Sequence, residues 1–487
     1  MPTSPSDPSP FGPSPSDPSS PGAGTAPAGR YDLAVVGAGP GGLAAAVTAA
    51  DHGLSVALID AGPRPGGQYY RHPAPGLGAA RPERLHHGWP VFADLSARLR
   101  AHTGHRRIAY LTGHHVWTAE PGAYWRLYAT VGPGAEDAAV VEAREVLLAT
   151  GAYERQLPFP GWTLPGVVTA GGAQAMLKAG LVLPGRRIVV AGSGPLLLAA
   201  ASSLVAAGAE VPAIVEATDY LGYARGLPTL LGNPAKLAEG AGHGAALLRH
   251  GVRLRRRAAV VEAHGDDRVT GVTVARLDRD WRPVPGGERR IDCDAVAVGH
   301  GLIPQIELAT ELGADTRVTP DGTVALAVDG EQRTSLPGLW AVGEACGVGG
   351  ADLAVAEGVL AAHAVAGRPA PAAALRRRDR RRAFAGLMAA AHRPDPGWTD
   401  WLTADTDVCR CEEVPAGRIR EAVDDLGAGD ARTVKLLTRA GMGWCQGRMC
   451  GPAVACLAGD PQARADSRPL ACPVPLGQLE RLGERST

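Results

Sequence analysis

The chain has 487 residues, enough for about three domains at roughly 150 residues each. Apolar residues make up 45% of it and charged residues 20%, and the formal net charge is zero, which excludes a generally basic surface that binds nucleic acid. The first 29 residues are almost entirely Pro, Ser, Gly and Ala. They have neither enough apolar surface to fold nor the apolar core of a secretory signal, so we expect a disordered tail and a cytoplasmic protein.

Residues 31–62 carry the pattern of a unit that binds an adenine dinucleotide. An apolar run at 33–36 is typical of a buried parallel strand, and a GxGxxG motif joins it to an Ala-rich helical segment. The three glycines permit a tight turn, the approach of a pyrophosphate to backbone N–H groups, and close packing of helix on strand. A second apolar run, 55–59, ends at an aspartate whose carboxylate suits a ribose 2′-OH. The predicted contacts of this unit are Gly37, Ala38, Gly39, Pro40, Gly42 and Asp60.

The chain next crosses the place where the far end of a bound dinucleotide would lie. The sequence GGQYYR at 66–71 makes this crossing, so Gly67 and Gln68 are predicted contacts. We expect a helix over 82–101, a small antiparallel sheet over 114–141, where apolar and polar residues alternate, and a buried strand over 146–149.

Residues 187–216 repeat the order strand, glycine turn, helix, strand and terminal acid, which indicates a second nucleotide-binding unit. Leu197 stands where the third glycine should be, and we expect it to force the helix away from the strand. Two interpretations stay open: an NAD(H) site, in which the terminal acid favours NAD over NADP, or a structural relic of one. The glycine turn also breaks the uncharged stretch 188–209, so we expect no membrane span. The candidate contacts are Gly192, Gly194 and Glu216.

Two later apolar runs predict further strands. The first is 294–298, and the second, 336–342, ends at Gly343 and Glu344, whose carboxylate suits a polyhydroxyl chain such as ribityl. Glycines at 349–350 open a helix that is predicted to reach about residue 366, with N-terminal N–H groups suited to an electron-rich carbonyl of a flavin.

Residues 368–400 are predicted to be a linker that contains an arginine-rich helix, 375–391. We expect its arginines to form a solvated face rather than a docking surface.

Six of the eight cysteines lie beyond residue 400, which favours metal ligation over disulfides in a reducing cytoplasm. A C-x-C pair and a C-x₄-C pair flank two predicted helices, 416–426 and 431–440. Zinc sites favour C-x-x-C knuckles, which this sequence lacks, so we expect a [2Fe–2S] cluster, with zinc as the alternative. The predicted ligands are Cys409, Cys411, Cys445 and Cys450; Arg410, Arg439 and Arg448 are expected to offset the cluster's charge, and Cys456 and Cys472 to be uninvolved.

Over about residues 30–367 these features resemble the flavoproteins with two dinucleotide-binding domains, the group that includes thioredoxin reductase. The resemblance implies an α/β fold in which a second Rossmann-like domain is inserted in the first, followed here by a small helical iron–sulfur domain. It also implies FAD at the first glycine turn, Asp60, Thr150, Gly151, Gly343 and Glu344, although that family usually has Asp in place of Glu344. Because no cysteine pair lies near 66–68 or in the second unit, a redox-active disulfide beside the flavin is excluded.

The predicted domains follow from these boundaries. They are a tail, 1–29; the FAD domain, 30–156 and 291–367; the second nucleotide domain, 157–290; a helical linker, 368–400; the [2Fe–2S] domain, 401–465; and a C-terminal tail, 466–487.

The cysteine segment resembles the [2Fe–2S] domain of bacterioferritin-associated ferredoxin. The amino-acid sequence around these cysteines, together with GGQYYR and ATGAYERQLPFPGW, resembles that of the larger subunits of opine oxidases, hydrogen cyanide synthase and proline or hydroxyproline dehydrogenases. This likeness implies a heteromeric oxidoreductase in which a smaller amino-acid-oxidase-like flavoprotein partner oxidises the substrate at a C–N bond.

Two other functions stay open: an NADH-dependent reductase that passes electrons through the cluster to a ferredoxin or oxygenase, and a non-catalytic scaffold or redox sensor. The sequence identifies no catalytic acid or base. Residues that are candidates by position alone are Gln68, Tyr69, Arg71, His72 and His300.

Overall fold

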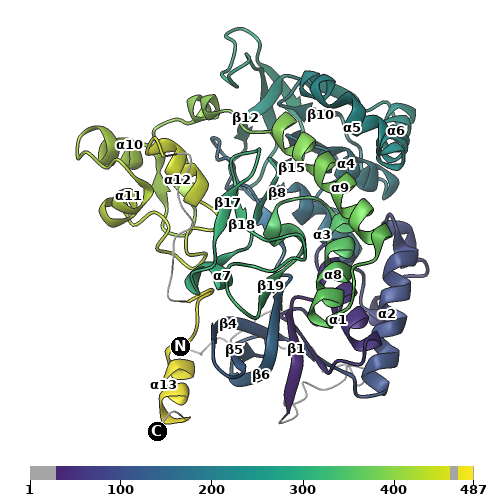
Figure 1. The fold of residues 1–487 in the computed structure, drawn as a ribbon. Coiled ribbons are helices and arrows are strands. Elements are labelled where there is room, and N and C mark those ends of the chain that lie inside the picture. The colour runs from purple at the N-terminus through teal and green to yellow at the C-terminus, as the bar shows by residue number, and fades with distance from the viewer. Residues whose placement is uncertain (1–28, 461–469, 486–487) are drawn as a thin grey trace, which may run out of the picture.

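The computed structural model describes residues 29–460 and 470–485. The predicted N-terminal tail therefore lies outside the described residues, except for its last position. The described part is an α/β protein with two Rossmann-like units and a small helical module at one side (Figure 1), so the predicted fold class is confirmed.

The first unit is a seven-stranded sheet in the order β3-β2-β1-β6-β5-β4, with β19 added on β6. The strands β1, β2, β3, β6 and β19 run parallel. Strand β5 pairs antiparallel with β6, and β4 pairs antiparallel with β5, which confirms the expected antiparallel segment. The strand bounds are β1 Arg30–Val36, β2 Val56–Asp60, β3 Ile108–Thr112, β4 His114–Glu120, β5 Trp125–Val131, β6 Asp137–Leu148 and β19 Leu339–Ala341.

Two helices lie side by side on one face of this sheet: α1 (Pro40–Asp51) and α8 (Ala351–Val365). Glycines permit this close packing. A Cβ on Gly42 would overlap the carbonyl oxygen of Gly37, and a Cβ on Gly358 would overlap that of Gly41. The third glycine of the first motif is therefore required by the fold itself.

The second unit is a five-stranded parallel sheet in the order β11-β10-β9-β15-β8, inserted between β6 and β19 of the first. Strand β15 pairs with β9 and β8, so residues 295–299 belong to the second sheet and not to the first unit, where the boundary at 291 had put them. The bounds are β8 Val167–Thr169, β9 Ile188–Gly192, β10 Ala213–Glu216, β11 Arg253–Arg256 and β15 Ala295–Gly299; β12 (Ala258–His264), β13 (Gly271–Arg276) and β14 (Arg289–Asp292) form a separate antiparallel sheet.

The helix expected over 82–101 is divided. A short 3₁₀ turn covers Pro82–Leu85, and α2 begins only at Trp89 and ends at Gly104. Gly88 lies between them with a φ of 72°, a left-handed conformation that interrupts a right-handed helix.

Helix α9 (Ala372–Ala391) packs against α8. Arg376, Arg377 and Arg380 are exposed, as expected of a solvated face, whereas Arg378, Arg381 and Arg382 are buried or half-buried and contact other elements. The Arg382 guanidinium lies 2.8 Å from the buried carboxylate of Glu357 on α8. Arg381 donates a hydrogen bond to Asn233 Oδ1 at 3.0 Å, which ties α9 to the second unit. These arginines hold the two units together, because a buried carboxylate requires a charged partner.

The cysteine module contains β20 (Asp407–Cys409), β21 (Val414–Pro415), α10 (Ala416–Asp424), α11 (Ala431–Thr438) and α12 (Gly451–Leu457). It shares a buried apolar cluster with the second unit. Within this cluster Trp401 stacks on Trp281 with parallel rings 6.2 Å apart, and its Nε1 donates to the Trp281 carbonyl at 2.9 Å. In the described ranges, no helix is both long and apolar enough to cross a membrane.

Candidate functional sites

The first glycine turn leads directly into α1. Gly39 is the N-cap residue, with an extended backbone, and Pro40 occupies the first helical position. A Cβ on Gly39 would meet no atom within 4 Å, so this turn faces open space. Asp60 accepts hydrogen bonds from the Ala38 N–H and, at 2.6 Å, from the Gly62 N–H. Burial raises the pKa of Asp60, and these N–H donors oppose that rise.

A cavity of about 980 Å³ opens over this turn. It lies between the two units and is large enough for a dinucleotide, since drug-sized ligands fill about 300–1,000 Å³. Ten of the predicted FAD contacts line it: Gly37, Gly39, Pro40, Asp60, Gly67, Gln68, Thr150, Gly151, Gly343 and Glu344. Ala38 and Gly42 are not among its lining residues, because Ala38 is fully buried and Gly42 packs against the turn. The residues present thus fit a dinucleotide by shape and by polar groups.

Glu344 lies at the edge of this cavity, in the short turn that follows β19. Its two carboxylate oxygens accept hydrogen bonds from Gly349 N–H at 2.8 Å and Gly350 N–H at 3.0 Å, immediately before α8. Burial raises the pKa of Glu344 to about 7. Glu344 therefore already accepts the N–H groups of both glycines that precede α8. A cofactor carbonyl could accept only from N–H groups that follow them, within the first turn of α8.

Four residues that were candidates by position, Gln68, Tyr69, Arg71 and His72, also line the cavity. Sequence reasoning missed their neighbour Lys178, whose Nζ lies 3.5 Å from the Tyr69 carbonyl oxygen. Burial lowers the pKa of Lys178 to about 8, and among the described residues no carboxylate lies within ion-pair distance of it. The rarity of lysine in this chain was the one sequence signal for it.

The fifth candidate, His300, lies away from this cavity. Its ring sits 6.0 Å from both Trp281 and Trp401, so it packs in the core between the second unit and the cysteine module. Burial lowers its pKa to about 3, so it remains neutral and has a structural role.

This burial predicts that acid destabilises the protein. The unfolded chain takes up a proton on this histidine below about pH 6.5, and the folded chain does not until about pH 3, so His300's contribution to stability is lost as the pH falls through 6.5. We expect a loss of about 2 kcal/mol between pH 7.5 and pH 5. Denaturant unfolding at both pH values should show a smaller loss in His300→Phe than in the unchanged protein; equal losses would contradict the assignment.

The second glycine turn differs from the first, because side chains of this chain cover it. The His392 imidazole lies 3.2 Å from Ser193 Oγ in the turn and 3.6 Å from the Glu216 carboxylate at the end of β10. Gly192, Gly194 and Glu216 are not among the residues that line the large cavity. Leu197 is fully buried, and α4 (Leu196–Ala206) begins two residues after Gly194, whereas α1 begins directly after Gly39.

The four predicted metal ligands come together in the cysteine module. The thiols lie within hydrogen-bonding reach of one another in pairs: Cys450 can donate to Cys409 or to Cys445, and Cys411 can donate to Cys445. Donation from the Cys450 thiol lowers the pKa of the thiol that accepts it, to about 6 for Cys409 and about 5 for Cys445, towards the thiolate form that binds metal. The same contacts and burial raise the pKa of Cys450, and the pKa of Cys411 is also raised, so these two thiols lose their protons only when a metal binds.

The thiols form a chain of pairs. In the described residues, no three side chains already converge to hold a single metal ion. A dinuclear cluster needs two thiolates on each of two irons, so a pairwise arrangement suits it. Two glycines make room for the pairs: a Cβ on Gly443 would overlap that of Cys411, and Gly441 donates its N–H to Cys409 Sγ at 3.4 Å.

Arg448, between two of the ligands, connects the cysteine loop to the wall of the large cavity. Its Nε lies 2.9 Å from Glu307, a lining residue that also accepts a hydrogen bond from the Tyr153 hydroxyl at 2.8 Å. Arg439 pairs with Glu412 at 2.9 Å. These two arginines therefore balance carboxylates, and the expectation that they mainly offset cluster charge is incomplete.

Cys456 and Cys472 take no part in the thiol group. Burial raises the pKa of both thiols, that of Cys472 to about 11, which keeps them protonated and unreactive. Cys472 does line the large cavity, where a C-terminal segment docks through a hydrogen bond from Ala471 N–H to the Trp117 carbonyl at 2.8 Å.

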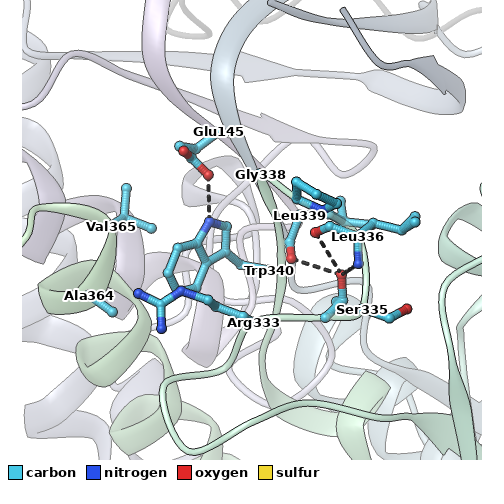
Figure 2. Close-up of a pocket in the computed structure, with 11 residues that line it drawn as sticks. Glu145, Arg333, Ser335, Leu336, Gly338, Leu339, Trp340, Ala364 and Val365 are labelled. Carbon is cyan, nitrogen blue, oxygen red and sulfur yellow. Dashed lines mark hydrogen bonds between the residues drawn. The ribbon is translucent and has the colours of Figure 1, made fainter.

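A second, smaller cavity of about 470 Å³ shares no lining residue with the large one. Figure 2 shows its wall: Trp340 donates Nε1 to Glu145 at 2.7 Å, and the Arg333 guanidinium lies 4.8 Å from the centre of the Trp340 ring. The polar groups in this wall are thus paired with one another, which is typical of a structural contact.

Comparison with known proteins agrees with this geometry. A family model described as "Pyridine nucleotide-disulphide oxidoreductase" matches residues 31–366, and one described as "BFD-like [2Fe-2S] binding domain" matches residues 408–457. The second match favours a [2Fe–2S] cluster over zinc, the two metal centres that the cysteine spacing allowed.

Relatives and a solved structure match nearly the whole chain. Hydrogen cyanide synthase subunit HcnB from Pseudomonas aeruginosa is 36% identical, over 85% of this chain and 90% of that protein. An opine oxidase subunit from Agrobacterium tumefaciens is 35% identical, over 87% and 84%. The crystal structure of L-proline dehydrogenase from P. horikoshii shares the fold, with a TM-score of 0.65 and 20% identity over 93% and 79% of the two chains.

These similarities and the two cofactor sites agree with one another. This chain therefore belongs to the pyridine nucleotide-disulphide oxidoreductase family, as an FAD-dependent oxidoreductase that carries a BFD-like [2Fe-2S] domain.

Proposed function

We propose that this chain is the electron-transferring subunit of a heteromeric dehydrogenase that oxidises an amino acid or opine at a C–N bond. The observation that carries the proposal is the ion pair between Arg448 and Glu307. This ion pair joins the loop that carries two of the cluster ligands to the wall of the dinucleotide cavity, so the two cofactor sites lie against each other in one packed structure. Both side chains are mostly buried, at 16% and 15% exposure, so water screens the pair little.

In this proposal the first glycine turn holds the pyrophosphate of FAD through its backbone N–H groups, and Asp60 accepts from the adenosine ribose. Glu344 accepts from the ribityl chain, and Cys409, Cys411, Cys445 and Cys450 hold the [2Fe–2S] cluster. The flavin supplies two-electron chemistry and the cluster one-electron transfer.

One cationic side chain in the wall of the cavity suits a reduced flavin. Lys178 lines the cavity next to Tyr69, in a place where burial strengthens its field. We propose that Lys178 stabilises the negative charge that reduction adds to the cofactor.

The names of the relatives support a heteromer. The hydrogen cyanide synthase and opine oxidase relatives are each named as one subunit of an enzyme. We propose that a smaller amino-acid-oxidase-like flavoprotein partner supplies the substrate site, and that electrons pass from it to the flavin and cluster of this chain.

Anaerobic reduction of the purified holoprotein tests this proposal. The flavin absorbance should bleach when the partner subunit is present together with its substrate, drawn from proline, hydroxyproline, glycine and an opine. The same substrates without the partner should leave the flavin oxidised. Bleaching by a substrate without any partner would contradict the heteromeric function.

Two alternatives predict other results. An NADH-dependent reductase would bleach rapidly with NADH alone, and a scaffold or redox sensor would turn over with no donor. The motif at Gly192, Gly194 and Glu216 is the feature that favours the reductase.

A further inference from the structure

A side chain from the end of α9 covers the second glycine turn, where a nicotinamide dinucleotide would bind. His392 is the C-cap residue of α9, and only 8% of its surface is exposed. Its ring is fixed by hydrogen bonds at both nitrogens. Nδ1 lies 3.2 Å from Ser193 Oγ and 3.3 Å from Thr218 Oγ1, and Nε2 lies 2.5 Å from the Tyr223 hydroxyl.

Among the described residues, Asp60 at the first turn accepts from backbone N–H groups alone, whereas the acid at the second turn also accepts from side-chain hydroxyls. Glu216 is only 1% exposed, and its carboxylate accepts from Gly194 N–H at 3.2 Å and from the hydroxyl of Tyr220 at 3.3 Å. The rings of Tyr220 and Tyr223 stack on one another 5.6 Å apart and each contacts the imidazole edge-on. The polar groups of the turn are thus satisfied without a nucleotide.

The two glycine turns show the steric consequence. A Cβ on Gly39 would meet nothing within 4 Å, whereas the space over Gly194 holds the His392 ring, with Cγ only 3.9 Å from the position of a Cβ. A pyrophosphate that approached the backbone of Gly194 from this side would compete with the imidazole for the same space. Binding would therefore require the end of α9 to leave its place.

The end of α9 is held in place by more than this histidine. The 3₁₀ turn η3 (Leu221–Gly226) packs against it through glycines: a Cβ on Gly222 would lie 3.1 Å from that of Ala391, and a Cβ on Gly226 would overlap the side chain of Leu387. After His392, residues 393–395 lead into η5 (Pro396–Trp401), whose tryptophans pack in the core shared with the cysteine module.

We infer that the second dinucleotide fold binds the chain's own His392 in place of a nicotinamide dinucleotide, and that this contact anchors the arm that carries the cluster module. The ligand of the site is an imidazole side chain. The inference goes beyond the proposed function and does not depend on the identity of the partner or of the substrate.

The first test is nucleotide binding to the holoprotein. NADH and NADPH fluorescence titrations, to about 1 mM, the upper end of ordinary substrate affinities, should show no saturable binding. Under anaerobic conditions neither nucleotide should bleach the flavin. Saturable binding by the unchanged protein would overturn the inference, whereas the proposed function depends separately on bleaching by partner plus substrate.

The second test is limited proteolysis of the arm, 393–400. His392→Ala should increase cleavage there by about tenfold or more, because the anchored segment opens locally more often. His250→Ala is the matched control, since His250 is an exposed histidine that caps α6 (Pro234–Arg249) in the same unit. Tyr223→Phe removes one hydrogen bond to the imidazole and keeps the ring, so it should give a smaller increase even if His392→Ala folds poorly. Unchanged cleavage in both variants would overturn the anchoring role.

Discussion

Replacing Gly39 with Val is expected to give a folded protein that purifies without FAD. The backbone of Gly39 has φ −70° and ψ −177°, which any residue adopts, and a Cβ there meets no protein atom within 4 Å. The added side chain would instead fill the space that the pyrophosphate must enter. We expect FAD affinity to fall by at least about a hundredfold, which corresponds to about 3 kcal/mol.

The measurement is the ratio of flavin to protein after reconstitution with excess FAD, with circular dichroism to check the fold. Gly104→Val is the matched control, because Gly104 is exposed at the end of α2 and a Cβ there also meets nothing. Full flavin content in Gly39→Val would refute the placement of the cofactor. Gly42→Val should behave differently and unfold the first unit, since its side chain would overlap the Gly37 carbonyl.

Serine in place of Cys409 or Cys445 is expected to remove the iron and leave FAD bound. A hydroxyl does not supply the thiolate that a [2Fe–2S] cluster requires, and the two residues belong to different loops of the thiol group. Because the first glycine turn belongs to a separate unit, the flavin site should keep its shape. We expect iron and inorganic sulfide to fall below about a tenth of the normal content, because the cluster binds only when its full set of ligands is present.

Cys456→Ser serves as the control for this pair, because Cys456 lies in the same module, on α12, and outside the thiol group. It should keep its iron and the visible absorbance of the cluster. If Cys409→Ser or Cys445→Ser retained full iron, the ligand assignment would be wrong; if both lost FAD as well, the two sites would be coupled more strongly than the separate units suggest.

The covered second turn bears on how electrons enter this protein. In the first unit, the glycine turn faces a cavity of about 980 Å³. In the second, the same backbone motif is closed by His392, Tyr220 and Tyr223. If the second turn holds His392 as inferred above, this asymmetry favours the proposed dehydrogenase over the reductase alternative, and the NADH titration tests it.

Features that depend on neighbouring residues were predictable from the sequence. The first strand, turn and helix follow from hydrophobic period and glycine spacing, because a tight turn with φ of 105° at Gly37 and the contact of Gly42 on its carbonyl are local geometry. The spacing of the four cysteines likewise identified two loops that a helical pair brings together. Each of these patterns lies within about 40 residues, so it can be recognised without information about the rest of the chain.

Only the tertiary structure decided the partners of residues that are distant in sequence. Ser193 and His392 are 199 positions apart, and neither position carries a pattern that indicates the other. Strand β15 belongs to the second sheet because it pairs with β9. Arg382 pairs with a buried glutamate, and does not face solvent as predicted, because α9 packs on α8. Whether a charged or aromatic side chain faces water, a ligand or another element is set by the packing of whole elements, and local sequence does not encode that packing.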